Sequence, residues 1–204
     1  GDGIAFDPES VKAQPIREDN AYGGTRITMA ARIGSARCAL HIDVGFGGAV
    51  TPEPQTVIYP TLLTGFQASV LRVYPVYTVI AEKYQAMVML GQANSRMKDF
   101  FDLAVIAQRT ELDGATLAAA IAATFARRQT TLPIERPLAL TKQFSEDAAK
   151  QRQWQAFLNK NRIASGSLGD TITLLGDMLW PPTQVAAAKS EATATWRPDS
   201  LQWV

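Results

Sequence analysis

The stretch VLRVYPVYTVIAEKYQAMVMLG, residues 70–91, marks the point where the chain changes from strand to helix. Before Pro75, the short and mostly apolar stretch 70–74 is typical of a strand. After Pro75, apolar side chains recur at helical spacing, with Pro75 suited to a first turn and Gly91 to the end of the helix. The sequence therefore predicts a sheet before this point and helices after it.

A β-hairpin is predicted upstream. Residues 25–33 and 36–46 alternate apolar and polar side chains around Gly34-Ser35, a two-residue turn that favours tight hairpins. An edge strand over 11–18 is expected before the hairpin, and the proline-rich stretch 45–63 after it should be mostly irregular. The turn fixes the register of the hairpin, and the predicted pairs are Ile33 with Ala36, Thr28 with His41 and Arg26 with Asp43.

Helical patterns continue downstream of Gly91. The predicted helices after the first begin at Ser95, Asp113, Ser145 and Leu168, and the last should halt at Pro181-Pro182. This order predicts an α+β fold, in which a small antiparallel or mixed sheet packs against a helical domain of about five helices. The expected domains are a β region over 1–74, a helical domain over 75–187 and a loosely ordered tail over 188–204.

Composition narrows the class of protein. Hydrophobic residues make up 47 % and charged residues 19 % of the 204 residues, which is typical of a globular chain. A single Cys38 and a single His41 exclude a disulfide framework and a His/Cys zinc site, and they favour a cytoplasmic protein. We find neither a signal peptide nor an apolar run long enough for a membrane span. The Gly-Asp-Gly start without methionine predicts that the natural protein extends upstream of Asp2.

The net charge of +1 means that nucleic acid would have to bind to a local basic patch. Two small basic clusters are candidates for such contact, or else form solvated helix faces. They are Arg127, Arg128 and Arg136, and Lys150, Arg152, Lys160 and Arg162.

Three places carry charged residues that suit phosphate chemistry. Asp43 lies on the polar face of a strand before a glycine-rich exit, where it would hold Mg²⁺ or simply pair with Arg26. Lys83 lies in line with the apolar residues of its helix, so it either reaches to the edge or points its ammonium into a cleft that holds phosphate. The run 95–102 places Arg96 and Asp99 three residues apart and Lys98 and Asp102 four apart, as a surface network or as a functional cluster.

Three segments together resemble a known family. HIDVGFG (41–47), IAEKYQA (80–86) and RMKDFFDL (96–103) are similar, in order and spacing, to the AbiEii/AbiGii nucleotidyltransferase-like toxins of bacterial abortive-infection (type IV toxin–antitoxin) systems. The resemblance implies a nucleotidyltransferase-type domain followed by a helical domain. It also implies use of NTP and Mg²⁺, an RNA (tRNA-like) or protein acceptor, and control by a cognate antitoxin.

The resemblance also implies roles for single residues. Asp43 matches the third strand carboxylate, which binds metal, and Lys83 matches a helical lysine near phosphate. Asp99 and Asp102 match the final acidic motif, in which Asp99 is the candidate base, and Arg96 and Lys98 stand beside it as nucleotide-binding groups.

One part of the family pattern is missing. The phosphate-cradling Gly-Ser turn followed by an Asp-x-Asp strand does not occur in this sequence, so two of three metal-binding carboxylates are absent. The chain by itself is therefore expected to bind neither Mg²⁺ nor NTP tightly and to be inactive alone. The alternative is a non-catalytic module that binds an antitoxin or RNA.

Overall fold

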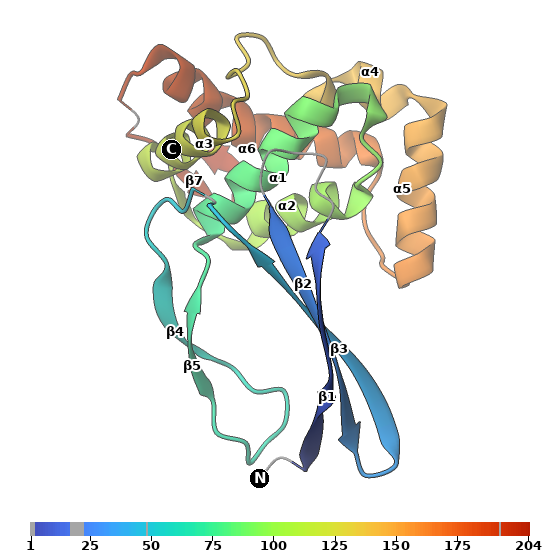
Figure 1. Cartoon of the computed structure of the whole chain (residues 1–204). Coiled ribbons are helices and arrows are strands. Elements are labelled where there is room, and N and C mark those ends of the chain that lie inside the picture. Colours follow the sequence, from blue (N-terminus) through green and yellow to red (C-terminus); the bar gives the residue numbers. More distant parts are fainter. Residues whose placement is uncertain (1–2, 17–22, 48, 192) are drawn as a thin grey trace. The chain divides into compact units, whose positions relative to one another are not determined.

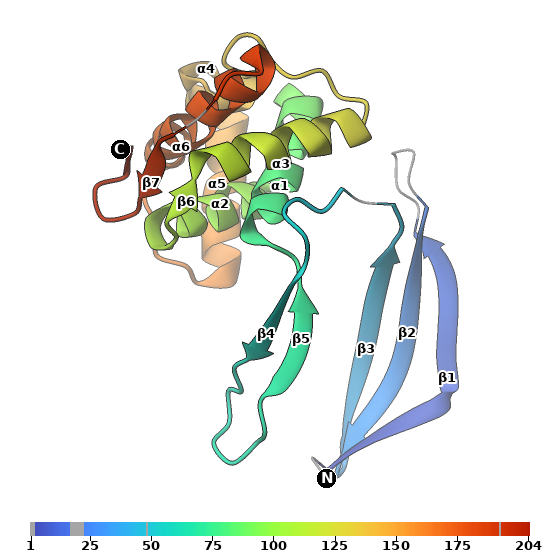
Figure 2. The same ribbon diagram turned by 90° about the vertical axis from the view of Figure 1, so that its left-hand side faces the viewer.

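The computed structural model describes residues 3–16, 23–47, 49–191 and 193–204, and the chain forms two compact units. The strand unit comprises 1–48 and 56–71, and the helical unit comprises 49–55 and 72–204. Figures 1 and 2 show strands throughout the first unit and mainly helices in the second. The α+β class and the small antiparallel sheets are confirmed.

The strand unit contains a three-stranded antiparallel sheet in the order β1-β2-β3. The predicted hairpin register is confirmed, because Ile33 pairs with Ala36, Thr28 with His41 and Arg26 with Asp43. The first strand begins earlier than predicted, and positions 17–18 of that prediction lie outside the described residues. The strands are β1 (Ile4–Ile16), β2 (Gly24–Ile33) and β3 (Ala36–Gly45).

A second, two-stranded sheet consists of β4 (Gln55–Tyr59) and β5 (Ser69–Val73). The expectation that 45–63 is mostly irregular is therefore wrong for β4. Thr56 to Tyr59 are β-branched or aromatic residues, which favour strands, and the prolines at 54 and 60 lie just outside the strand rather than in it.

The first helix lies where the sequence predicted it. The first helix has Pro75 at its N-cap and ends at Gly91, whose φ of 47° lies in the left-handed region that glycine adopts without strain. The Asp113 side chain caps the third helix by accepting a hydrogen bond from the Thr116 amide at 2.7 Å. The helices are α1 (Val76–Leu90), α2 (Met97–Arg109), α3 (Gly114–Arg127), α4 (Lys142–Glu146), α5 (Ala148–Asn161) and α6 (Leu168–Ala188), with 3₁₀ turns η1 (Gly91–Ala93) and η2 (Leu138–Leu140).

One apolar core holds these helices together. Its fully buried side chains come mainly from α1, α2, α3, α4 and α6, and aromatic rings pack in pairs within it. Tyr84 of α1 packs against Phe125 of α3, and Phe100 of α2 stacks on Phe144 of α4. Burial of these rings fixes α1 against α3, and it fixes the α2 helix that carries the acidic motif against α4.

The fourth predicted helix does not begin at Ser145. Ser145 belongs to the short α4, and the longer helix α5 begins after Asp147. The Asp147 carboxylate accepts hydrogen bonds from the Ala149 and Lys150 amides at 2.8 and 2.9 Å. Because it satisfies two free N–H groups, Asp147 is a stronger helix start than Ser145.

The last helix continues through the two prolines that were expected to end it. Proline has no N–H, so Pro181 leaves the Asp177 carbonyl without its usual helical donor. The indole N–H of Trp203 donates to that carbonyl at 3.0 Å. This hydrogen bond replaces the missing one, and α6 extends to Ala188.

The end of the chain was expected to be loosely ordered, but residues 195–204 form two short strands. Strands β6 (Leu112–Asp113), β7 (Thr195–Arg197) and β8 (Gln202–Trp203) make a small sheet. Trp196 is fully buried, and its indole N–H donates to the Ala107 carbonyl at 2.8 Å. A contact between residues this far apart in sequence cannot be inferred from the composition of the tail. Across the described helices, none combines the length and apolar character needed to cross a bilayer.

Candidate functional site

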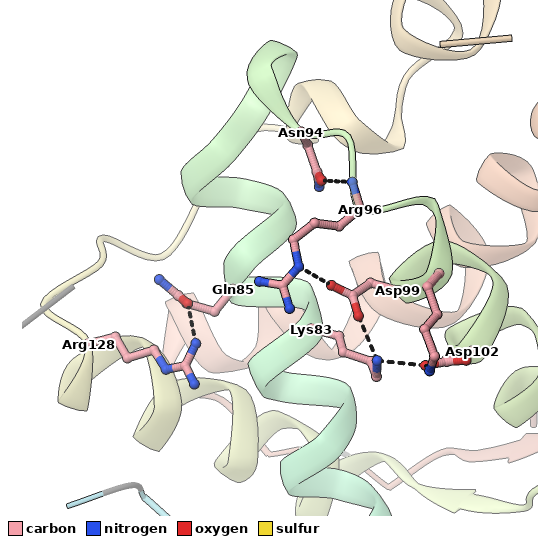
Figure 3. A network of polar contacts seen from close by, with 8 residues as sticks. Lys83, Gln85, Asn94, Arg96, Asp99, Asp102 and Arg128 are labelled. Carbon is pink, nitrogen blue, oxygen red and sulfur yellow. Dashed lines mark hydrogen bonds and ion pairs between the residues drawn. The ribbon is translucent and has the colours of Figure 1, made fainter. Parts of the chain in front are cut away.

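The candidate site lies within the helical unit, around a lysine of α1. Lys83 follows the buried Ile80 along the helix and precedes the buried Tyr84. Its side chain is only 20 % exposed, so it does not extend freely into solvent. Figure 3 shows it pointing from α1 toward the start of α2.

Five charged side chains meet there, and we call them the Lys83 network: Lys83, Arg96, Lys98, Asp99 and Asp102. The Lys83 ammonium donates to Asp99 Oδ1 at 2.6 Å and to Asp102 Oδ2 at 2.7 Å. Lys98 donates to the same Asp102 oxygen at 2.6 Å. Arg96 Nε lies 2.8 Å from Asp99 Oδ2, a buried oxygen that it meets as an ion pair rather than as a well-aligned hydrogen bond.

The turn before α2 sets the position of the acidic residues. Asn94 accepts a hydrogen bond from the Arg96 amide at 2.9 Å through its side-chain oxygen, and α2 begins at Met97 rather than at the predicted Ser95. Asp99 falls in the first helical turn, where a negative charge is stabilised by the free N–H groups of the helix. Asp102 follows one turn later on the same face.

Burial differs sharply across the network. The Asp99 side chain is 7 % exposed, whereas those of Arg96 and Lys98 are 59 % and 71 % exposed. Arg96 and Lys98 therefore lie at the solvent-facing edge of the network, and Asp99 lies inside it. An anionic ligand would reach Arg96 and Lys98 first.

The surroundings shift two ionisation equilibria. Burial alone would lower the pKa of Lys83, but hydrogen bonds to Asp102 and Asp99 outweigh it, and the pKa is raised. Burial would raise the pKa of Asp102, but its hydrogen bonds from Lys83 and Lys98 lower that pKa below the ordinary 3.8. Both groups are therefore held in their charged forms at neutral pH.

This linkage predicts a dependence of stability on pH. A lowered pKa means that Asp102 stabilises the fold above pH 3.8 and that this contribution disappears as the pH falls further. We expect Asp102→Asn to lower the free energy of unfolding by about 1–2 kcal/mol at neutral pH and by progressively less in acid. Urea unfolding at several pH values measures the difference, and a difference that stays constant into acid would contradict the prediction.

Asp43 lies in the strand unit, on β3. Both of its carboxylate oxygens bind the Arg26 guanidinium, at 2.6 and 2.7 Å. Arg26 and Asp43 are close to half exposed, and the hydrogen bond from Arg26 lowers the pKa of Asp43. The predicted pairing across the hairpin is therefore confirmed, while a role for Asp43 as metal ligand stays a prediction.

Sequence reasoning did not find the polar residue Gln85, and it did not find the contacts of Arg128 and Lys150. Gln85 of α1 is buried and accepts a hydrogen bond from Arg128 at 2.9 Å (Figure 3). Arg128 also pairs with Glu82 at 3.3 Å. Lys150 was assigned to a basic cluster, but it is buried at 5 % exposure. Its spacing of four residues from the apolar Trp154 is the signal that could have placed it on the inner face of α5.

Comparison with known protein families points to the same part of the chain. The sequence model of the AbiEii nucleotidyl transferase toxin of type IV toxin–antitoxin systems matches residues 2–168. The matched range includes Asp43 and the whole Lys83 network, and the resemblance indicated by the three segments is confirmed. No match was found among curated proteins.

Proposed function

Because the chain belongs to the family of AbiEii nucleotidyl transferase toxins of type IV toxin–antitoxin systems, we propose that the Lys83 network takes part in nucleotide transfer. The donor would be an NTP and the acceptor an RNA (tRNA-like) or a protein. Membership of this family also implies a cognate antitoxin as partner. The observation that supports the network as the site is the placement of one ammonium between two carboxylates from the next helix, at 2.6 and 2.7 Å.

The network suits the phosphates of an NTP better than it suits Mg²⁺. Both Asp99 oxygens face cations, and one Asp102 oxygen contacts two lysines. No group of three or more potential ligands for a metal ion occurs among the residues described. Mg²⁺ would neutralise phosphate charge when bound. From the family resemblance we assign its binding to Asp43, which would have to release Arg26 from its two oxygens to hold the ion.

Each member of the network then has a chemical task. Arg96 and Lys98 are exposed enough to turn toward phosphate oxygens, and Lys83 adds a third positive charge behind them. While Arg96 Nε and Lys83 hold Asp99 in place, this carboxylate accepts the proton of the acceptor hydroxyl, whose oxygen attacks the α-phosphorus of the NTP as pyrophosphate leaves. Asp102 keeps Lys83 and Lys98 in place during this step.

A labelling assay on the protein that the gene encodes tests the role of Asp99. We expect Asp99→Asn to lower transfer of label from an α-³²P NTP to bacterial RNA or protein about 100-fold, because a general base is lost while the shape is kept. Matched measurements on Glu111→Gln control for loss of one negative charge, because Glu111 is an exposed acid two residues beyond the end of α2. Equal labelling by wild type and Asp99→Asn would contradict the proposal.

A second function is a module that binds an antitoxin or RNA without catalysis. The absence of an Asp-x-Asp strand from the sequence favours it. Calorimetry on the protein that the gene encodes, with each NTP and Mg²⁺, separates the two functions, because a pure binding module takes up no nucleotide. Binding of a nucleotide that weakens when Lys98 is changed to Gln would exclude the second function.

A further inference from the structure

A buried lysine lies outside the Lys83 network, on α5. Lys150 is 5 % exposed, and its ammonium donates to the Asn94 carbonyl at 2.8 Å and to Gln153 Oε1 at 3.4 Å. The ammonium also lies 5.3 Å from the centre of the Phe144 ring, within range of a cation–π contact.

The surroundings of this charge are unusual. Burying an ammonium is costly unless it is paired, and buried lysines normally meet a carboxylate. Among the side chains that the structure describes, no carboxylate lies within ion-pair distance of Lys150. The main acceptor is instead a backbone carbonyl, that of Asn94. A methionine of similar length would fill the same space without this cost, so the ammonium has a use beyond packing.

Asn94 connects Lys150 to the network. It is 1 % exposed, and its side-chain oxygen accepts the Arg96 amide at 2.9 Å. Arg96 in turn contacts Asp99, which contacts Lys83. The sequence of contacts therefore runs from α5 through the turn before α2 to the ammonium of α1.

A second contact ties the same turn to the start of α5. The Gln92 side-chain amide donates to the Asp147 carboxylate at 3.1 Å, and Asp147 is the residue that caps α5. The turn 91–96 is thus held to α5 at two points. Of these, the Lys150 contact is the buried one and lies nearer to Arg96.

We propose that Lys150 is a positioning residue for the Lys83 network, which it serves by fixing the Asn94 carbonyl and so the direction of Arg96 toward Asp99. Its effect on transfer rests on the proposed function, whereas its effect on Arg96 does not. Removal of the ammonium frees the turn, and Arg96 then spends less time in contact with Asp99.

The test compares Lys150→Met with Lys150→Arg in the whole chain. The readout that does not depend on activity is the Arg96 backbone amide signal in ¹H–¹⁵N NMR, which the hydrogen bond to the buried Asn94 side chain protects from exchange with water. We expect Lys150→Met to shift this signal and speed its exchange, and Lys150→Arg to restore it at least in part. In the protein encoded by the gene, we expect Lys150→Met to lower transfer about tenfold, as removal of a supporting hydrogen bond does at other sites.

Lys160→Met is the matched control, because Lys160 lies exposed in the last turn of the same helix and should change neither readout. If Lys150→Met fails to fold, Lys150→Gln keeps a donor without the charge and is measured in its place. A folded variant with a native Arg96 signal would overturn the inference, even if its stability had fallen. If the wild type transfers no nucleotide, the proposed function fails and the Arg96 signal still decides the role of Lys150.

Discussion

Replacing Lys83 by methionine is expected to lower the free energy of unfolding by about 3 kcal/mol. Removing one partner of a buried ion pair leaves the other charge desolvated without compensation. The Asp99 side chain, at 7 % exposure, would keep only the Arg96 contact, and Asp102 would keep only Lys98. Most of the lost free energy therefore comes from Asp99, because it is the less hydrated of the two carboxylates.

A double-mutant cycle isolates this interaction. Urea unfolding followed by far-UV circular dichroism gives the stability of wild type, Lys83→Met, Asp99→Asn and the double variant. We expect the double variant to lose less than the sum of the single losses, since the uncompensated carboxylate is gone. Lys160→Met controls for a surface lysine. Additive losses, or a Lys83→Met chain as stable as wild type, would show that the ammonium is not coupled to Asp99.

Trp196→Ala is expected to destabilise the helical unit by about 4 kcal/mol. Truncating a large buried aromatic side chain removes its apolar contacts and leaves a cavity. Trp196 is fully buried, packs against Trp203 at a ring distance of 5.6 Å, and donates to the Ala107 carbonyl of α2. The variant also leaves that carbonyl without its donor, which adds to the loss.

The comparison that separates these contributions is Trp196→Phe. Phenylalanine keeps much of the ring contact but has no N–H, so we expect a loss of about 1–2 kcal/mol. The same urea experiment measures both variants. A Trp196→Ala chain within about 1 kcal/mol of wild type would contradict the role of residues 195–204 as an ordered part of the helical unit.

Local signals predicted local features well. The hairpin register follows from alternation and the Gly34-Ser35 turn, and the limits of α1 follow from Pro75 and Gly91. The ion pairs of α2, three and four residues apart, follow from helix geometry in the same way. In each case the deciding residues lie within the element that they define or directly beside it.

Features that depend on distant residues escaped prediction. The extension of α6 past Pro181 depends on an indole group of Trp203, and the burial of Lys150 depends on the Asn94 carbonyl. The contact of Lys83 with Asp99 joins two helices, so spacing on either helix leaves it undetermined. Resemblance to the family pointed to both residues, and the structure brings them together, while their roles in transfer remain proposals.

If the Lys83 network binds nucleotide as proposed, its charge balance has a consequence for selectivity. Three cations surround two carboxylates, which leaves one positive charge in excess. Such a site attracts any triphosphate through charge alone, and added salt weakens the attraction for adenine, guanine, cytosine and uracil nucleotides alike. Preference for one base must therefore come from side chains that touch the base itself, outside these five residues.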